Sequence, residues 1–269
     1  MFACLVLSSV TATAREAFEL SVLTYNIHGL SDWIARDDPP ARIPRILAKA
    51  AGYGLVLLQE DFAYHELVVA NAAHPHLFRG NEAWAPLMEG AGLTILSHFD
   101  SSEPPVREPY GVCNGYLGAA NDCLGNKGFL MVRLALPTGA KLDVWNTHLD
   151  AGASNGDHRA RSAQLERLAA AIEAQSAGRA LLIGGDFNLE WDVVRDRALL
   201  EWFRDRVGLT IAAQTPPGGW PQRLDYLLVR SAAGVRIERL GEGKDEHMID
   251  GAAAPLSDHP AIFVRLGVR

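Results

Sequence analysis

Short apolar segments recur along the chain between polar stretches rich in Gly and Pro. Segments with strand periodicity, or with a continuous apolar run of strand length, predict strands. They are residues 20–25, 55–59, 93–97, 129–136, 141–147, 180–184, 224–230 and 261–266. Apolar residues at helical spacing predict helices at 39–50 and 157–176, and Asp37 and Asp38 are candidate caps for the first.

The order of these segments indicates the fold class. Residues 137–140 (PTGA) join two strands as a hairpin, and the strands do not alternate strictly with helices. A purely parallel sheet is therefore not expected, and the pattern predicts an α/β (α+β) fold with a two-sheet core flanked by helices. No repeat or linker divides the chain, so we expect residues 18–269 to form a single domain.

The N-terminal segment, residues 1–14, is apolar and then rich in small residues. Ala12-Thr13-Ala14 has the form of a signal-peptidase site, which predicts a signal peptide and a periplasmic or secreted protein. The basic residues that usually open a signal are missing, which suggests a start inside a longer signal. A buried first strand or an arbitrary start is the alternative. No later apolar run approaches the ~20 residues that would cross a bilayer, so no transmembrane segment is expected.

Composition and charge narrow the function. The chain has 269 residues, of which 48% are hydrophobic and 21% charged, and this excludes a disordered protein or a small disulfide scaffold. A net charge of −7 disfavours a generic nucleic-acid binder but not an enzyme, because an acidic metal site is itself negative. Export would leave Cys113 and Cys123 in an oxidising compartment, where they would form a disulfide. In the cytosol, two free thiols are expected.

Acids, amides and imidazoles lie at the ends of the predicted strands. One such residue is more often a turn former or a helix cap. Several together can line one cleft, because the ends of neighbouring strands meet at the edge of a sheet. The set comprises Asn26, Glu60, Asn146, His148, Asp186, Asn188, Asp225, Asp258 and His259.

These residue types suit one kind of chemistry. Carboxylates and amide oxygens without cysteine favour Mg²⁺, or Mn²⁺, over structural zinc. The chain has no Walker-type phosphate loop and no G-x-S-x-G elbow, which disfavours nucleoside-triphosphate hydrolysis and serine-hydrolase chemistry. A metal ion, a histidine near an acid, and amide groups suit the attack of water on a phosphoester.

The ordered blocks YNIHG, LLQE, NTHL, GGDFN, RLDYLLV and SDHPAI resemble those of the endonuclease/exonuclease/phosphatase superfamily, which has the deoxyribonuclease I-like fold. The resemblance runs from about Leu20 to Leu266. It implies a four-layered sandwich of two packed mixed sheets. It also implies metal-dependent hydrolysis of phosphoric (di)esters in one step, without a covalent intermediate.

The same resemblance assigns roles on the metal side and for the base. It implies Glu60 as the main ligand of the divalent metal, with Asn26 close to it and Asp258 completing that side. His259 would be the general base or the stabiliser of the transition state. Asp225 would orient it, since a histidine needs a carboxylate on its second nitrogen to fix its tautomer.

Further residues would contact the phosphate. Asp186 and Asn188 would position the attacking water and the scissile phosphate. His148 would hydrogen-bond a phosphate oxygen, and Asn146 would support it. The Asp122-x-x-x-x-Lys127-Gly128 block resembles the region before the histidine strand of secreted neutral sphingomyelinases. It makes Lys127 a candidate phosphate-binding or supporting residue, although a simple turn into a strand explains it equally well.

The sphingomyelinase-like branch, a phospholipid phosphodiesterase, is the preferred reading. A secreted deoxyribonuclease-like endonuclease is the alternative, because the RLDYLLV block is most similar to the corresponding block of repair nucleases. An inactive binding protein on the same fold is a second alternative.

Trp84 and Trp220 lie in loops rich in Gly and Pro. They are candidates either for a transient contact with a membrane surface or for packing over the core. The expected partner is a phosphoester, from phospholipid or nucleic acid, and no protein partner is inferred.

Overall fold

The computed structural model describes residues 17–31, 36–82, 90–116, 119–218, 222–232 and 234–269. The predicted signal peptide, with Cys4, and both Trp84 and Trp220 lie outside the described residues. Among the residues described, no helix combines the length and the apolar character needed to cross a membrane.

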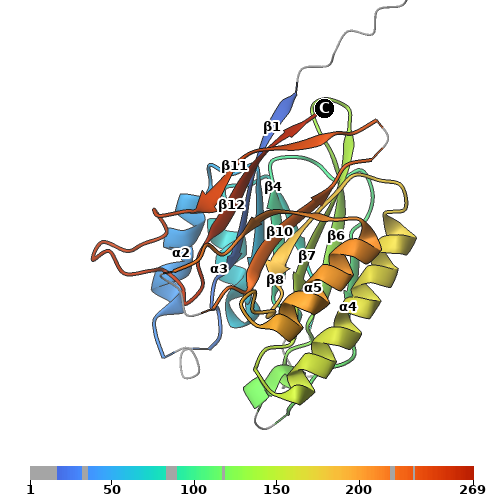
Figure 1. The fold of residues 1–269 in the computed structure, drawn as a ribbon. Helices are drawn as coiled ribbons and strands as arrows, with labels where there is room; N and C mark the ends of the chain where they lie inside the picture. The colour runs from blue at the N-terminus through green and yellow to red at the C-terminus, as the bar shows by residue number, and fades with distance from the viewer. Residues whose placement is uncertain (1–16, 32–35, 83–89, 117–118, 219–221, 233) are drawn as a thin grey trace, which may run out of the picture.

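Two six-stranded mixed sheets form the centre of the molecule (Figure 1). The first has the order β11-β12-β1-β2-β4-β3, and the second has the order β5-β6-β7-β8-β10-β9. Only β1 and β2, and β7 and β8, pair in parallel. The first sheet contains β1 (Phe18–Asn26), β2 (Leu55–Gln59), β3 (His76–Arg79), β4 (Leu93–Ser97), β11 (Ile237–Lys244) and β12 (Ile262–Val268). The second contains β5 (Val106–Pro109), β6 (Gly128–Ala135), β7 (Lys141–His148), β8 (Leu181–Asp186), β9 (Thr210–Gln214) and β10 (Asp225–Arg230).

Helices cover the outer face of each sheet (Figure 1). Apolar residues of α2 (Pro39–Ala50) and α3 (His65–Asn71) pack on the first sheet. Those of α4 (Asn155–Gln175) and α5 (Val194–Val207) pack on the second. Two short 3₁₀ turns, Phe62–Tyr64 and Ala119–Leu124, complete the described elements.

Alternation along the strands produces three apolar layers. In β2, Leu55 and Leu57 face the core between the sheets, whereas Val56 and Leu58 face the helices. Successive side chains of a strand point to opposite faces, so a strand covered on both faces is apolar throughout. This is why the central strands appear in the sequence as continuous apolar runs.

The structure confirms the predicted fold class and every predicted strand and helix, with shifts of one or two residues at their ends. Asp38 caps α2 by accepting a hydrogen bond from the backbone of Ala41, as expected. The strands β3, β5, β9 and β11 were not predicted, and these are the four edge strands. Edge strands are short or polar because this discourages pairing with other chains, and so they lack the apolar signal. The helices α3 and α5 were also not predicted.

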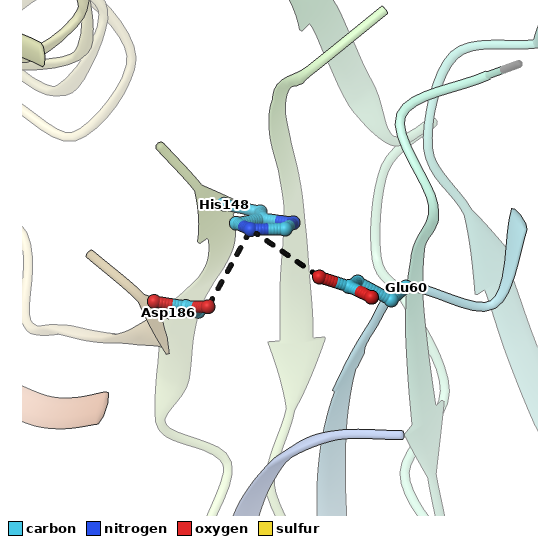
Figure 2. A group of neighbouring side chains, drawn as sticks. All are labelled: Glu60, His148 and Asp186. Atoms are coloured by element: carbon cyan, nitrogen blue, oxygen red, sulfur yellow. Dashed lines mark ion pairs between the residues drawn. The ribbon is translucent and has the colours of Figure 1, made fainter. Parts of the chain in front are cut away.

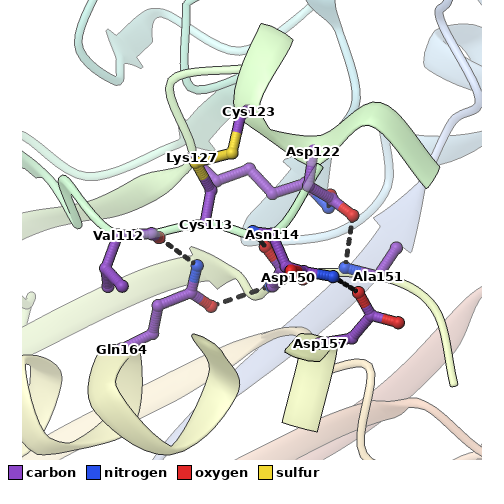
Figure 3. The surroundings of a disulfide bond; sticks show 10 residues. All are labelled: Val112, Cys113, Asn114, Asp122, Cys123, Lys127, Asp150, Ala151, Asp157 and Gln164. Carbon is purple, nitrogen blue, oxygen red and sulfur yellow. Dashed lines mark hydrogen bonds and ion pairs between the residues drawn. A yellow bond between two sulfur atoms is a disulfide. The ribbon is translucent and has the colours of Figure 1, made fainter. Parts of the chain in front are cut away.

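A disulfide joins Cys113 and Cys123, with 5.2 Å between their Cα atoms (Figure 3). Its formation confirms the predicted pairing. The disulfide-bonded loop is hydrogen-bonded to the segment that follows β7. The Asn114 backbone donates to Asp150 Oδ2 (2.8 Å), and Asp122 Oδ2 accepts from the Ala151 backbone (2.9 Å). The disulfide thus fixes a loop that lies beside the end of β7.

Replacing Cys113 and Cys123 together by serine is expected to lower the free energy of unfolding by roughly 2–3 kcal/mol, because the bond restricts a short loop in the unfolded chain. Urea titration of the two proteins measures the difference. Mass spectrometry after alkylation without reduction is expected to show no modified cysteine at these positions. Two alkylated thiols in protein purified from an oxidising compartment would contradict the prediction.

Candidate metal and catalytic site

Side chains from both sheets meet at one end of the sandwich. Asn26 ends β1 and Glu60 follows β2, and these strands are parallel, so both residues lie at the same edge. His148 and Asp186 end the parallel strands β7 and β8. Asp225 begins β10, which is antiparallel to β8, and it pairs with Asp186 in the ladder. The strand ends predicted to line one cleft are therefore brought together.

His259, the last member of the group, lies just before the C-terminal strand β12. Because β12 begins at Ile262 and runs antiparallel to β1, the residues before it return to the end where β1 terminates. His259 Nε2 lies 3.7 Å from Asp186 Oδ2, and its Nδ1 lies 3.1 Å from Asp225 Oδ2. The predicted contact between His259 and Asp225 is thus present.

Three residues that follow these strands have left-handed backbone conformations: His28 (φ 49°), Glu60 (φ 59°) and Asn188 (φ 49°). Such conformations cost of order 1–3 kcal/mol at non-glycine residues and are concentrated at functional sites. Gly29 holds the turn at Glu60, because its N–H donates to the Glu60 carbonyl (2.8 Å) and a Cβ at residue 29 would lie 2.3 Å from that oxygen. The kinks redirect the chain where each strand leaves its sheet.

Glu60, His148 and Asp186 form one group with its ligand atoms within 4.8 Å of one another (Figure 2). His148 Nε2 lies 3.4 Å from Asp186 Oδ2 and 3.8 Å from Glu60 Oε1. Asn26 Nδ2 donates to both carboxylates, at 3.0 Å to Glu60 and 3.2 Å to Asp186. The Oε2 atom of Glu60 is buried and accepts no hydrogen bond from the described residues.

These features fit a divalent cation. An unpaired buried carboxylate oxygen is costly unless a cation or a donor compensates it. Carboxylate and amide oxygens are the ligands that Mg²⁺ and Mn²⁺ prefer. The structure supports Glu60 as a candidate ligand with Asn26 beside it.

The buried charges at the site perturb one another. Burial raises the pKa of the Asp186 carboxyl, and the negative charge of Asp225 adds to this, while the positive charges of His259 and Lys127 oppose it. Burial alone would lower the pKa of His259, but the combined charges of Asp225, Asp186 and Asp258 outweigh it and raise that pKa well above its ordinary value. Burial, with Lys127 and His259 nearby, lowers the pKa of His148, which is therefore neutral at pH 7.

Lys127 and Asn188 support the same backbone carbonyl. Lys127 Nζ donates to the Leu149 oxygen (2.9 Å) and forms an ion pair with Asp122, and its side chain is 8% exposed. Asn188 Nδ2 donates to the same oxygen (3.0 Å). Both residues thus hold the chain directly after His148, and their expected contacts with phosphate stay predictions.

Asn146 lies beneath the site and joins the sheets. Its Nδ2 donates to the carbonyls of Leu58 (2.8 Å) and Thr94 (3.0 Å) in the first sheet, and its Oδ1 accepts from Gln59 Nε2 (2.8 Å). The side chain is fully buried and its polar atoms bond to protein groups, which fits the supporting role. The sequence did not indicate Gln59 as its partner, since a glutamine inside an apolar strand indicates only burial.

Asp258 pairs with His28 and is not one of the residues grouped with Glu60. Its Oδ2 is 2.9 Å from His28 Nδ1, and its side chain is 57% exposed. The expected place of Asp258 on the metal side rests on the resemblance alone. His28 was not among the predicted site residues, although its position two residues after Asn26 in YNIHG was a signal that could have drawn attention to it.

Comparison with known proteins identifies the family of this chain. The model of the Endonuclease/Exonuclease/phosphatase family matches residues 23–259, a range that includes all of these site residues. The chain belongs to this family. The resemblance drawn from the sequence blocks is thereby confirmed.

Within this family, sphingomyelinases are among the curated relatives. The sphingomyelinases of Mycobacterium bovis and Mycobacterium tuberculosis H37Rv are each 30% identical to this chain over 280 residues, which is 94% of this chain and 54% of the relative. The chain therefore spans about half the length of the curated relatives it matches.

Solved structures of several proteins share the fold. Sphingomyelinase C from Streptomyces griseocarneus has a TM-score of 0.67 at 23% identity, covering 92% of this chain and 99% of that chain. A beta toxin mutant from Staphylococcus aureus with bound magnesium ions has a TM-score of 0.69 at 16% identity, with coverage of 92% and 99%. D. rerio TDP2 complexed with a single-strand DNA product has a TM-score of 0.67 at 16% identity, with coverage of 92% and 98%.

Glu60→Gln is expected to weaken Mg²⁺ binding at least ~10-fold, because an amide offers no charge to the cation. Isothermal titration calorimetry with MgCl₂ measures the affinity, and circular dichroism checks the fold. Glu66→Gln, an exposed carboxylate in α3, is the matched control and is expected to bind as the unmodified protein does. Equal affinities in the two variants would show that Glu60 is not a ligand.

Proposed function

We propose that this chain is a divalent-metal-dependent phosphodiesterase that hydrolyses its substrate by a single attack of water. The observation that carries the proposal is the shared position of Asp186. Its Oδ2 lies within 3.2 Å of Asn26 Nδ2, 3.4 Å of His148 Nε2 and 3.7 Å of His259 Nε2. One buried carboxylate thus adjoins both the candidate metal group and the candidate base.

Glu60 would hold Mg²⁺, or Mn²⁺, with Asn26 close to it and orienting its carboxylate through Nδ2, and with Asp258 as the further candidate on that side. A cation bound there neutralises phosphate charge and stabilises the charge that develops in the transition state. Asp186 would orient the water through its carboxylate oxygen. His148 would donate a hydrogen bond from one ring nitrogen to a phosphate oxygen. Because His148 is neutral, it would add no second positive charge next to Lys127.

His259 is the proposed proton acceptor in its neutral form, which a cation bound beside Asp186 would favour, because its charge would oppose the carboxylates that raise the pKa of His259. Its Nδ1 faces the Asp225 carboxylate, so the proton on Nδ1 is fixed and Nε2 is the nitrogen left to take a proton from water. Asp225 is itself held by Thr215 Oγ1, which lies 3.3 Å from Oδ2. Asn188 and Lys127 would fix the chain after His148. The resemblance to the family further implies that they contact the phosphate.

The preferred substrate is a phospholipid phosphodiester such as sphingomyelin. The 30% identity to curated sphingomyelinases and the net charge of −7 support this over nucleic acid. A deoxyribonuclease-like endonuclease is the alternative, because TDP2 with bound single-strand DNA has the same fold. An inactive binding protein is the second alternative, and the complete set of acid, amide and imidazole groups argues against it.

Export to the periplasm or the medium is part of the proposal. The disulfide between Cys113 and Cys123 supports it, because disulfides persist in oxidising compartments. A transient contact of the protein with the membrane surface through Trp84 and Trp220 stays a proposal from the sequence.

A parallel assay of sphingomyelin vesicles, lysophospholipid and plasmid DNA tests the function, each with Mg²⁺ and with EDTA. Release of phosphocholine from sphingomyelin that EDTA abolishes is the expected result. Cleavage of DNA alone would favour the endonuclease. No hydrolysis of these substrates or of bis-p-nitrophenyl phosphate would favour the binding protein.

His259→Ala is expected to lower kcat by ~10²–10⁴-fold, the usual range for a general acid–base group. Asp225→Asn is also expected to lower kcat, because an amide favours the wrong tautomer and does not stabilise imidazolium. The double variant is expected to be little worse than His259→Ala, since the two residues act as a unit. Multiplicative losses in steady-state kinetics would show instead that Asp225 works independently of His259.

A further inference from the structure

The two chain segments that frame the candidate site separate from each other beyond the β1–β12 ladder. The ladder ends with Thr24 opposite Ile262. Beyond that pair, residues 26–28 carry Asn26 and turn away, and residues 256–259 carry His259. Backbone groups past the end of a ladder need other partners. The structure supplies those partners from side chains.

Arg42 is the side chain that bonds to both segments. From α2, its Nη1 donates to the carbonyls of Ile27 (2.8 Å) and Leu256 (2.9 Å), and its Nη2 donates to the carbonyl of His28 (2.8 Å). Its Nη2 also donates to Asp37 Oδ1 (3.1 Å), and its Nε lies 2.9 Å from Asp37 Oδ2. The planar fork of the guanidinium thus reaches three carbonyls from two segments while Asp37 compensates its charge.

Two further contacts join the same segments. Ser257 Oγ donates to the Asn26 carbonyl (2.7 Å) and accepts from the His259 backbone (3.4 Å), and His28 pairs with Asp258 (2.9 Å). Both contacts come from the two segments themselves. Arg42 differs because it bonds to both segments from a third element, α2, and only 12% of its side chain is exposed.

We propose that Arg42 is a positioning residue that fixes the metal-side residue Asn26 relative to the base His259. The inference rests on the proposed function of the same site. Its physical basis is that the geometry of a catalytic group matters on a scale of about 1 Å, where a misplacement can cost ~10²-fold in rate. Lysine cannot replace arginine here, because one ammonium cannot reach carbonyls that the two terminal nitrogens of the fork reach separately.

Arg230 offers a matched control. At the opposite end of β10 from Asp225, its guanidinium donates to the carbonyls of Arg179 (3.2 Å), Val207 (2.7 Å) and Ser176 (2.5 Å). It is thus also a clamp on three backbone oxygens. Arg230 lies five positions along the strand from Asp225, which is about 17 Å in an extended strand. Loss of this clamp should affect folding without affecting the site.

The test compares Arg42→Lys with Arg230→Lys at equal folded fraction, with bis-p-nitrophenyl phosphate as substrate. Arg42→Lys is expected to lower kcat ~10–100-fold with KM changed less than ~3-fold, whereas Arg230→Lys stays within ~3-fold in both. Methylguanidinium added to Arg42→Ala is expected to restore part of kcat, and not to affect Arg230→Ala. Equal kcat in the two lysine variants would overturn the proposal. So would a failure of methylguanidinium to restore any kcat to Arg42→Ala when Arg42→Lys keeps the kcat of the unmodified protein.

A second readout is independent of the reaction. Hydrogen–deuterium exchange of the metal-free protein is expected to rise at least ~10-fold in peptides covering residues 26–31 and 255–260 of Arg42→Lys, and not in those of Arg230→Lys. Unchanged exchange there would overturn the positioning role. If the unmodified protein hydrolyses no phosphoester while exchange rises as expected, the proposed function fails and the structural role of Arg42 stands.

Discussion

Each of the two sheets carries half of the candidate site, so the distance between the sheets is the constraint on which the site depends. Glu60 and Asn26 belong to the first sheet, and His148 and Asp186 belong to the second. The amide of Asn146 crosses between them beneath the site and bonds to carbonyls of β2 and β4. Apolar packing between the sheets is not directional, whereas these hydrogen bonds fix one relative placement.

Concentrated negative charge is the second constraint. Glu60, Asp186 and Asp225 lie close together, and two of them are almost fully buried. Buried carboxylates of like charge are unfavourable without compensation. His259 compensates Asp225 and Asp186 on one side, and the unpaired oxygen of Glu60 leaves the other side to a cation. In the proposed function, a cation bound beside Glu60 would offset this unfavourable concentration of negative charge.

The loops around the site are held by bonds to backbone carbonyls. Lys127 and Asn188 bond to the oxygen of Leu149, and Arg42 bonds to oxygens of both segments that lie beyond the end of the β1–β12 ladder. A loop past the end of a sheet has carbonyls without ladder partners, and a long cationic or amide side chain can satisfy them. Precision at the site therefore comes from residues that need not touch the substrate.

The sequence by itself determined the central strands, the two helices α2 and α4, and the polar strand ends, and it offered Asp37 and Asp38 as caps, of which the structure uses Asp38. These follow from local rules: apolar runs mark buried strands, and neighbouring strand ends meet at one edge of a sheet. The contact of His259 with Asp225 was expected from the resemblance of the sequence blocks to the family. Only the tertiary structure decided the edge strands, the inward turn of Asn146, the pairing of Asp258 with His28 and the reach of Arg42. Edge strands lack the apolar signal because one side of their ladder is unpaired. The other contacts join positions as far apart as Arg42 and Leu256, and a bond to a backbone carbonyl imposes no residue type on its acceptor, so the sequence carries no mark of it.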